Sequence, residues 1–432
     1  MNVPNIFKHN RATLKLLFVG MLSLAMSIPL LFVRSIISER QDLQLSAEQT
    51  ITERWGGSQT ISGLVAIVNS PAVHTDTRSI ETRWLWRANV LSDLSISADL
   101  STEWRYLGIY QVPVYTTRLR IDGRIDRAKL DSLQPEGDLL LWLPVGDVRG
   151  VREVSPLKLG TLEIPARPMT VMADKYSGLQ FTLPAAERDR LEETYSLEIS
   201  LAGSHSLQFL PLADSTRVSL EADWSHPEFI GQFLPAERNI DDDGFEAIWQ
   251  LTSLNRSYGD HWLMSEMSDQ QLNAAGFGLR LETPVDGYQR SERSVKYGFL
   301  FITLTFFTLF LIEVLTGRPL HPVPYILTGA ALAVFYLVLL ALSEYLSFSD
   351  SFVIAAGLLV LIITPYTGAV LGGRSRGYLV GTMMGLTYAL LYVLVSAQHL
   401  ALLLGSLSLL MAITALMFLT RNVDWYHYDS SE

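Results

Sequence analysis

The sequence of 432 residues is too long for one compact domain, and its apolar residues, 49% of the total, lie mainly in the C-terminal third. Its net charge of −11 argues against a nucleic-acid partner, because phosphates require a basic surface. The absence of cysteine excludes a disulfide framework, a thiolate nucleophile and a thiolate metal site.

Six separate apolar segments are long enough to cross a bilayer as helices. In the clearest of them, nineteen residues at about 1.5 Å each span roughly 28 Å, close to the thickness of the hydrocarbon core. We therefore expect an integral membrane protein with an α-helical bundle of six transmembrane helices. These are predicted at residues 14–33, 297–315, 323–342, 352–370, 378–395 and 400–419.

The first apolar segment has the basic start and apolar run of a secretory signal. However, its run is about twenty residues long and is followed by Arg34 instead of a small-residue cleavage site. We interpret it as an uncleaved anchor that follows a cytoplasmic N-terminus of residues 1–13. Loosely helical spacing of apolar residues from Ser38 to Trp55 predicts that the anchor continues as a short stalk helix, which Gly56 ends.

Basic residues in the short loops indicate the orientation of the helices. The opposite short loops contain Glu344 and Asp350. Both termini, including a tail of residues 420–432, are therefore predicted to be cytoplasmic, and the large domain is predicted to lie outside. The basic residues assigned to the cytoplasmic side are Lys8, Arg11, Lys15, Arg318, His321, Arg374, Arg376 and Arg421.

Residues 34–296 separate the first two apolar segments and carry most of the charge. From Thr60 to Leu281 the dominant apolar period is two, which is typical of strands. Because no helical pattern intervenes, we predict a large all-β, sandwich-like domain inserted between helices 1 and 2.

No group of residues indicates a catalytic site, a metal site or a cofactor. Residues 239–244 place oxygen ligands and Gly244 as a calcium loop does, but Gln250 stands where that loop needs a bidentate Glu. We interpret this stretch as a solvated turn. The eight histidines show no spacing typical of metal ligands.

A candidate binding surface lies on the segment between His226 and Pro235. Pro227 and Pro235 favour an extended or turning backbone, and the segment between them does not have the pattern of a strand. If its side chains Phe229, Ile230 and Phe233 are exposed together, they form an apolar patch of the kind that binds lipid or protein. The alternative is that this loop folds back and closes one end of the β domain.

Within the membrane, Glu313 is the residue that requires an explanation, since a carboxylate in lipid is costly unless paired or neutral. We expect it to reach the cytoplasmic interface or to pair with Arg318, and a role in a proton or substrate pathway is the alternative. Gly377, Gly381 and Gly385 have the double GxxxG spacing that allows another helix to approach closely. The alternative is that these glycines face lipid.

Several stretches, distributed over nearly the whole chain, carry a family resemblance. They are residues 106–115, 224–235, 284–288, 290–297, 321–322, 342–344 and 420–426. In this order they resemble the CreD family, bacterial inner-membrane proteins described as cell-envelope integrity proteins. Leu107 stands where the family usually has Arg, and residues 397–399 replace an acidic pair.

The resemblance implies an inner-membrane location and a link to the envelope-stress response governed by the CreBC two-component system, including altered tolerance of cell-wall antibiotics. In that membrane, the β domain that the loop charges predict to lie outside is expected to be periplasmic. It implies no reaction. We therefore favour a non-enzymatic protein whose β domain senses or binds an envelope component. A membrane transporter of an envelope-related small molecule is the first alternative, and an enzyme acting on wall or lipid precursors is the second.

The partners expected on this reading are the lipid bilayer and an envelope protein or lipid that binds the β domain. Nucleic acid is not expected, and the sequence indicates no oligomeric state.

Overall fold

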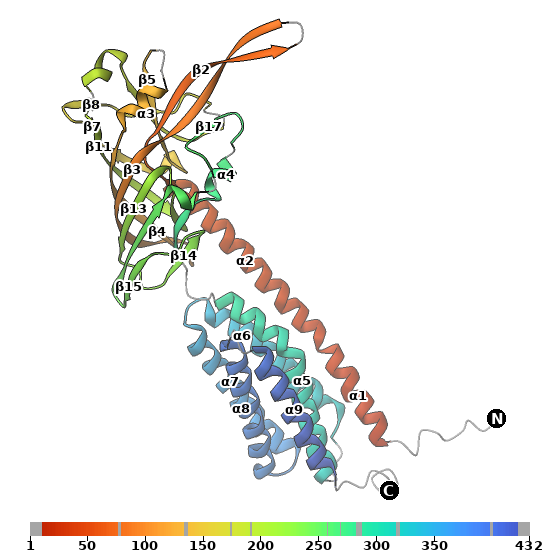
Figure 1. The fold of residues 1–432 in the computed structure, drawn as a ribbon. Coiled ribbons are helices and arrows are strands. Elements are labelled where there is room, and N and C mark those ends of the chain that lie inside the picture. The colour runs from red at the N-terminus through yellow and green to blue at the C-terminus, as the bar shows by residue number, and fades with distance from the viewer. Residues whose placement is uncertain are drawn as a thin grey trace. The chain divides into compact units, whose positions relative to one another are not determined.

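A computed structural model describes residues 11–421 except 77–78, 134–136, 173–174, 191, 257, 268, 282–286, 317–319 and 398–400 (Figure 1). The chain divides into two compact units. The helical unit comprises Met1–Gln44 and Pro284–Glu432, and the β unit comprises Leu45–Thr283.

The helical unit is a bundle in which α5 packs against α1, α6 and α8, while α7 packs against α6 and α8. Helix α9 contacts α8. The helices are α1 (Arg11–Ala25), α2 (Ser27–Trp55, which continues into the β unit), α5 (Gly287–Thr316), α6 (Pro322–Ser343), α7 (Phe348–Val370), α8 (Arg374–Ser396) and α9 (Ala401–Thr420).

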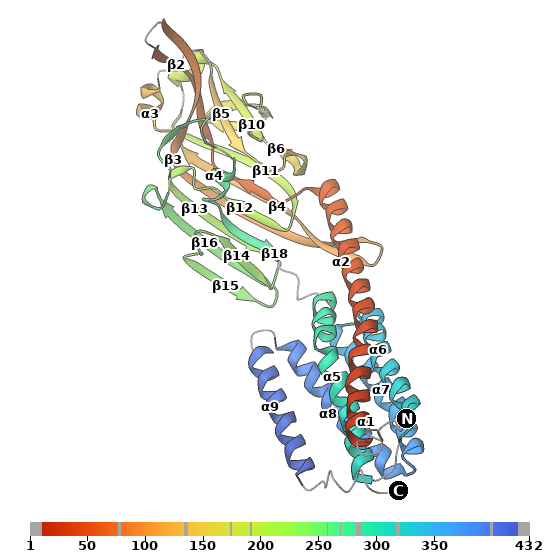
Figure 2. The same ribbon diagram turned by 90° about the vertical axis from the view of Figure 1, so that its right-hand side faces the viewer.

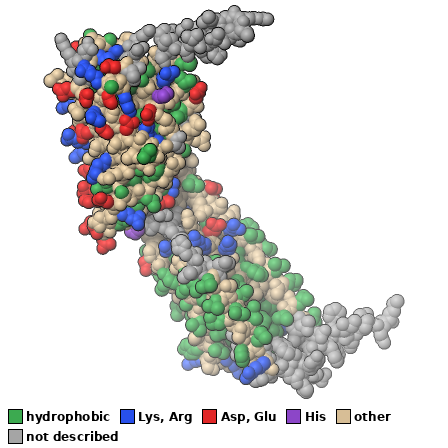
Figure 3. All heavy atoms as spheres, viewed as in Figure 1, with side chains coloured by type: hydrophobic (Ala, Val, Ile, Leu, Met, Phe, Trp, Pro, Cys, Tyr) green, Lys and Arg blue, Asp and Glu red, His purple; other side chains and the backbone are tan. Residues whose placement is uncertain are grey.

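Among the described residues, five helical segments are long and apolar enough to cross a membrane. They are Leu14–Trp55, Gly287–Val314, Pro322–Ser343, Phe348–Val370 and Arg374–Ser396. The sixth predicted segment also forms a helix, α9, which is apolar along its length. Figure 3 shows hydrophobic side chains covering the surface of the helical unit, whereas the surface of the β unit carries charges of both signs. The prediction of a membrane protein is thus confirmed.

Two helices extend beyond their apolar cores. The first is interrupted at Met26, because Pro29 has no N–H with which to bond the Ala25 carbonyl, and it then continues to Trp55, which confirms the predicted stalk helix. The second, α5, begins at Gly287, ten residues before the predicted segment. Its polar first turns are helical because Ser291, Ser294 and Val295 are buried against the bundle.

The β unit contains a small sheet and a large one (Figure 2). The small sheet has the order β1 (Gln59–Ile61), β12 (Ser206–Phe209), β18 (Phe277–Leu281) and β14 (Pro227–Gly231). The main path of the large sheet is β8 (Leu162–Ile164), β7 (Leu157–Leu159), β11 (Thr194–Ser204), β4 (Tyr110–Arg124), β3 (Ser79–Leu107), β2 (Val65–Asp76), β5 (Leu139–Pro144), β10 (Gly178–Leu183) and β9 (Arg167–Pro168). Side strands of this sheet are β13 (Ala213–Ala222), β16 (Gly244–Thr252), β15 (Glu237–Asp241), β17 (His261–Leu263) and β6 (Val151–Val154).

Strand β3 organises the large sheet, because its 29 residues pair with β2, β4 and β17 in antiparallel fashion and with β13 in parallel fashion. One apolar core contains residues of both sheets, including Leu119, Trp249, Phe209 and Phe277. Its side chains follow the predicted period of two; in β13, for example, buried and exposed residues alternate. A β-rich unit is therefore confirmed. Its short helices in the described part are α3 (Arg127–Ser132) and α4 (Asp269–Asn273).

The end of α2 is fixed to the β unit by its last residue, Trp55. The guanidinium carbons of Arg105 and Arg152 lie 4.2 and 4.9 Å from the centre of its ring, and its indole N–H donates to the Tyr115 carbonyl at 3.2 Å. Cation–π contacts of this kind stabilise an aromatic ring that is only partly buried. The last turn of α2 is therefore packed against strand residues of the β unit.

Candidate functional sites in the two units

The first part of the segment predicted to carry the binding surface, Pro227–Gly231, is the strand β14, so the prediction of a loop is wrong there, whereas residues 232–235 form no strand. Strand β14 pairs with β18, and Phe229 faces Leu279 in the register. The ring centre of Phe229 lies 5.7 Å from that of Phe245 and 5.8 Å from that of Trp249. A strand this short, bounded by Pro227 and Gly231, owes its conformation to its partner and not to its own pattern.

The three predicted binding residues lie half-buried at the edge of the core. Phe229 and Phe233 pack against the apolar core, with the Phe233 ring centre 6.2 Å from that of Phe277, while Ile230 is half-exposed. Such packing is expected if the segment closes one end of the β unit, which was the alternative to an exposed binding surface.

A second apolar surface of the β unit is more exposed. We call it the hairpin tip, and it consists of Trp104, Tyr106, Leu107 and Ile109 at the end of β3 and in the turn before β4. The exposed fractions of these side chains are 38%, 67%, 40% and 42%. The turn is tight because Gly108 adopts a φ of +64°, which glycine favours at the first position of a two-residue hairpin loop.

Residues at the base of the hairpin tip make side-chain contacts with the rest of the β unit. Arg105 stacks on Trp55 and pairs with Glu103 at 2.7 Å, and the Trp104 ring lies 5.7 Å from that of Trp224. Trp104 and Tyr106 therefore share one face of the hairpin, and Leu107 and Ile109 lie at its turn. Four large apolar side chains are thus exposed to water close together, which is typical of a protein-binding or lipid-binding surface. The sequence signal available was a two-residue turn flanked by aromatic residues at positions 104–110.

In the helical unit, Glu313 is fully buried and forms an ion pair with Lys15 of α1. Its carboxylate also accepts hydrogen bonds from the Leu320 N–H at 3.0 Å and from the Tyr325 hydroxyl at 2.9 Å. Lys15 donates in addition to the Leu320 carbonyl at 3.0 Å. The charge is therefore compensated within the bundle, where it joins α1, α5 and α6. The predicted partner Arg318 lies outside the described residues.

The sequence interpretation did not identify Lys15 as the partner of Glu313. The two residues are 298 positions apart, and Lys15 was assigned to the basic N-terminal flank. A signal was present, because Lys15 lies inside the first apolar segment, where an unpaired cation is as costly as an unpaired carboxylate.

The three predicted packing glycines differ in their surroundings. A Cβ on Gly377 would lie 2.6 Å from the Thr364 carbonyl oxygen, and one on Gly381 would clash with the Thr364 side chain. A Cβ on Gly385 would meet no atom within 4 Å. Helices α7 and α8 therefore approach closely at Gly377 and Gly381 and separate at Gly385.

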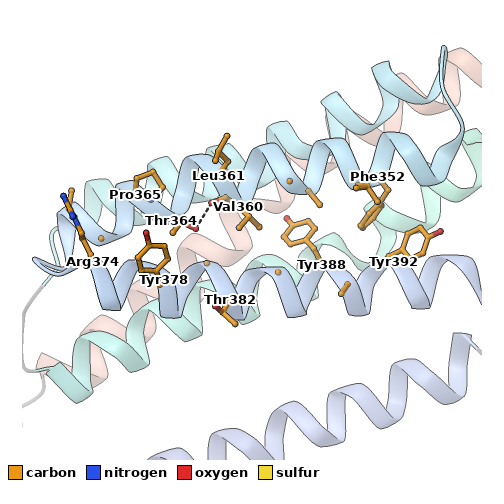
Figure 4. A pocket seen from close by; sticks show the side chains of 18 of the residues that line it. Phe352, Val360, Leu361, Thr364, Pro365, Arg374, Tyr378, Thr382, Tyr388 and Tyr392 are labelled. Atoms are coloured by element: carbon orange, nitrogen blue, oxygen red, sulfur yellow. Dashed lines mark hydrogen bonds between the residues drawn. The ribbon is translucent and has the colours of Figure 1, made fainter.

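A groove of about 1420 Å³ lies between α7 and α8, and we call it the α7–α8 groove. Figure 4 shows Arg374 and Tyr378 at one end of it and Phe352 and Tyr392 at the other. Small and apolar residues line the part between the ends: Ala356, Gly357, Val360, Leu361, Gly385 and Ala389. Tyr388 also lines the groove; it is 2% exposed, and its hydroxyl has no hydrogen-bond partner among the described residues.

The part of the chain that the structure describes contains no group of three His, Asp or Glu residues able to hold a metal ion. The arrangement of the molecule is instead that of a membrane bundle joined to a β unit with an exposed apolar tip.

Comparison with known proteins agrees with the membrane character of the helical unit. The family model described as "Inner membrane protein CreD" matches residues 11–426. The inner membrane protein CreD of Escherichia coli (strain K12) is 30% identical over 418 residues, which cover 94% of this chain and 92% of that protein. This chain therefore belongs to the CreD family of inner membrane proteins.

Proposed function

We propose that the protein is a non-enzymatic, multi-pass inner-membrane protein that supports the integrity of the cell envelope. In this proposal all six apolar segments cross the membrane, both termini are cytoplasmic, and the β unit is periplasmic, where it binds an apolar surface of another envelope component through the hairpin tip. The exposure of the hairpin tip is the observation that carries the proposal.

The argument for binding rests on the contrast between the hairpin tip and the rest of the β unit. The unit buries its apolar side chains in one continuous core and a second, smaller cluster. Tyr106, Leu107 and Ile109 could have been polar without loss of that core, since 40% or more of each side chain is exposed. Exposed aromatic and aliphatic groups gain free energy when a partner covers them.

The charge distribution supports the proposed orientation. Arg374 and Arg376 lie in the first turn of α8, beside the loop from α7, and Arg421 follows α9. Glu344 follows α6, and Asp350 lies in the first turn of α7. Short loops with basic residues stay in the cytoplasm. In the proposal of six crossings, the connection between α2 and α5, and therefore the β unit, lies on the opposite side from these basic residues.

The bundle interior offers less support for a transporter. Among the described residues of the helical unit, Glu313 is the only charged side chain that is fully buried, and it is paired with Lys15. Transport pathways normally contain several intramembrane charges or paired broken helices. The Glu313–Lys15 pair is better explained as a structural contact.

The test is a double variant, Tyr106→Ser with Ile109→Ser, in the full-length protein, produced in cells that lack their own copy. We expect an unchanged melting temperature, because both side chains are exposed, together with loss of the protein's contribution to tolerance of a cell-wall antibiotic. The matched control is Ile240→Ser with Leu254→Ser, which removes two other exposed apolar side chains of the β unit. Full tolerance in the tip variant would contradict the proposed role of the hairpin tip.

A further inference from the structure

The α7–α8 groove has a property that the proposed function does not use, which is the chemical difference between its two ends and its middle. Its middle is apolar and opens to the side, where Val353 and Leu361 are largely exposed. Since α7 and α8 are both able to cross a membrane, the molecules that reach this opening are lipids or apolar helices. The charge at one end of the groove indicates which of these two occupants binds there.

The end of the groove at Arg374 and Tyr378 carries a positive charge that no acidic side chain neutralises among the described residues. The Arg374 side chain lines the groove and is exposed, and no acidic side chain pairs with it among the residues that the structure describes. Helix α8 begins there with Gly373 as its N-cap, without a side-chain cap and without an acidic residue in its first turn. The first N–H groups of a helix and its dipole attract anions, phosphate in particular.

The opposing end of α7 carries only a partial negative charge, less than the full positive charge of Arg374, and several of its carbonyl oxygens accept hydrogen bonds within the turn. The Leu371 N–H donates to Thr367 at 2.9 Å, and the Gly373 N–H donates to Gly368 at 2.9 Å. The Arg376 guanidinium donates to the Leu371 carbonyl at 2.7 Å, so that Arg376 holds the turn while Arg374 faces the groove.

The groove is long enough for the acyl chains of one leaflet of a bilayer. Its lining on α8 runs from Arg374 to Val393, an axial rise of roughly 28 Å, and the part from Arg374 to Gly385 covers roughly 16 Å, about half of a 30 Å hydrocarbon core. Tyr378, one turn inside, exposes 67% of its surface at the level where aromatic residues gather near headgroups. At Gly385 the absence of a side chain leaves open space on the floor of the groove.

We propose that the α7–α8 groove is a binding site for one anionic diacyl phospholipid of the surrounding bilayer. Its phosphate group binds Arg374 and the N–H groups at the start of α8, and its acyl chains lie along the groove as far as Gly385. A partner helix would fill the apolar part but would leave the positive end without a counter-charge, which is why the charge favours the lipid.

The experiment uses the full-length protein, purified and delipidated in detergent, with its melting temperature measured as phosphatidylglycerol is added. Phosphatidylcholine with the same acyl chains is the comparison. We expect a saturable rise in melting temperature with phosphatidylglycerol and a clearly smaller one with phosphatidylcholine. An equal response to both lipids would show a general lipid effect and would overturn the proposal.

Two variants locate the site. Arg374→Gln should weaken the response to phosphatidylglycerol by roughly tenfold in lipid concentration, the loss expected for one charge-assisted contact. Gly385→Leu should fill the floor of the groove and reduce the response to both lipids without lowering the melting temperature of the delipidated protein. Gly20→Leu is the matched control, since a Cβ on Gly20 also meets nothing within 4 Å but Gly20 lies on α1, outside the groove. A Gly385→Leu protein that responds like Gly20→Leu would overturn the proposal.

Two further measurements separate this lipid from other occupants. A headgroup in the opposite half of the groove, near the buried Tyr388 hydroxyl, would be sensitive to Tyr388→Phe and insensitive to Arg374→Gln, whereas we expect the reverse. If the groove is instead an interface between two copies of the chain, light scattering will show a dimer that Gly385→Leu dissociates. Either result would contradict the proposed phospholipid site.

Discussion

The two units place the same kinds of side chain in opposite positions. In the β unit, Val218 and Leu220 of β13 are buried while Arg217 and Glu221 are exposed. In the helical unit, Leu361 is 70% exposed, while Ser294, Thr328 and Ser351 are buried. Apolar surface costs free energy in water and none in hydrocarbon, so that small residues and hydroxyl groups form the helix contacts in a membrane.

This difference decides which observations are informative in each unit. An exposed apolar cluster is exceptional in the β unit, so the hairpin tip indicates binding. A buried charge is exceptional in the helical unit, so Glu313 requires a partner, which Lys15 supplies. An exposed leucine in the helical unit does not by itself indicate a binding site, because most apolar side chains of a membrane helix face lipid.

The largest effect is expected from a cavity in the core of the β unit. Phe277 is fully buried and its ring contacts those of Phe209, Phe233 and Trp249. Phe277→Ala should lower the free energy of unfolding of the β unit by roughly 3–5 kcal/mol. Urea unfolding of the full-length protein, followed by tryptophan fluorescence, measures this change.

The control for Phe277→Ala is Leu254→Ala, which removes a side chain that is 93% exposed and should change stability by less than about 0.5 kcal/mol. Equal unfolding curves for the two variants would mean that the two sheets do not share the core described above.

The next effect concerns the buried charge of the helical unit. Glu313→Ala leaves the Lys15 ammonium without its carboxylate, which should cost up to roughly 3 kcal/mol, less than for a fully buried pair because the Lys15 side chain is 24% exposed. Lys15→Met combined with Glu313→Met should recover much of the loss, since both charges are then removed. Thermal unfolding in detergent provides the measurement, and an unchanged melting temperature for Glu313→Ala would contradict the ion pair.

The helix contact between α7 and α8 gives a smaller and more local prediction. Gly381→Leu places a branched side chain against Thr364 and should cost about 1–3 kcal/mol by overpacking. Gly385→Leu is its control, because it points into open space four residues away. Thermal unfolding in detergent should show a lower melting temperature for Gly381→Leu only. Equal melting temperatures would place Gly381 on the lipid-facing surface.

The smallest effect is a pH dependence in the β unit. Asp147 accepts hydrogen bonds from the Arg149 side chain at 2.9 Å and from the Gly57 N–H at 3.0 Å, and the bond from Arg149 lowers the pKa of the Asp147 carboxyl. Since the folded pKa lies below the unfolded one, the stabilisation is complete above about pH 4 and is lost as pH falls through the lowered folded value.

Asp147→Asn should therefore lower the stability of the β unit by less than about 1 kcal/mol at pH 6, and the difference from the parent should shrink in acid. Melting temperatures at pH 6 and pH 3 give the comparison. A difference that grows in acid would show that Asp147 is not stabilised as a carboxylate.

Much of the fold followed from local patterns. Apolar runs of about twenty residues identified the helices α6, α7 and α8, because a bilayer imposes both length and composition on a helix that crosses it. The period of two identified the strands whose one face is buried, such as β13. Hydropathy did not reveal that α5 begins at Gly287, since the part of a helix outside lipid can be polar.

Features that depend on contacts between residues far apart in the sequence could not be predicted. Strand β14 does not show the alternation of apolar and polar residues that is typical of a strand, and its pairing with β18 stabilises its extended conformation. Lys15 and Glu313 are brought together by the packing of α1 on α5. The close approach at Gly381 and the open space at Gly385 share one sequence motif and differ only in what lies opposite.

The central claim is that the β unit and the loop between α7 and α8 lie on opposite sides of the inner membrane. Because the chain has no cysteine, single cysteines introduced at two exposed positions, Asp242→Cys in the β15–β16 turn and Ser375→Cys at the start of α8, report their side without background. The account predicts that an impermeant thiol reagent labels Asp242→Cys in cells with an intact inner membrane and labels Ser375→Cys only after lysis. The reverse pattern, or equal labelling of both positions, would contradict it.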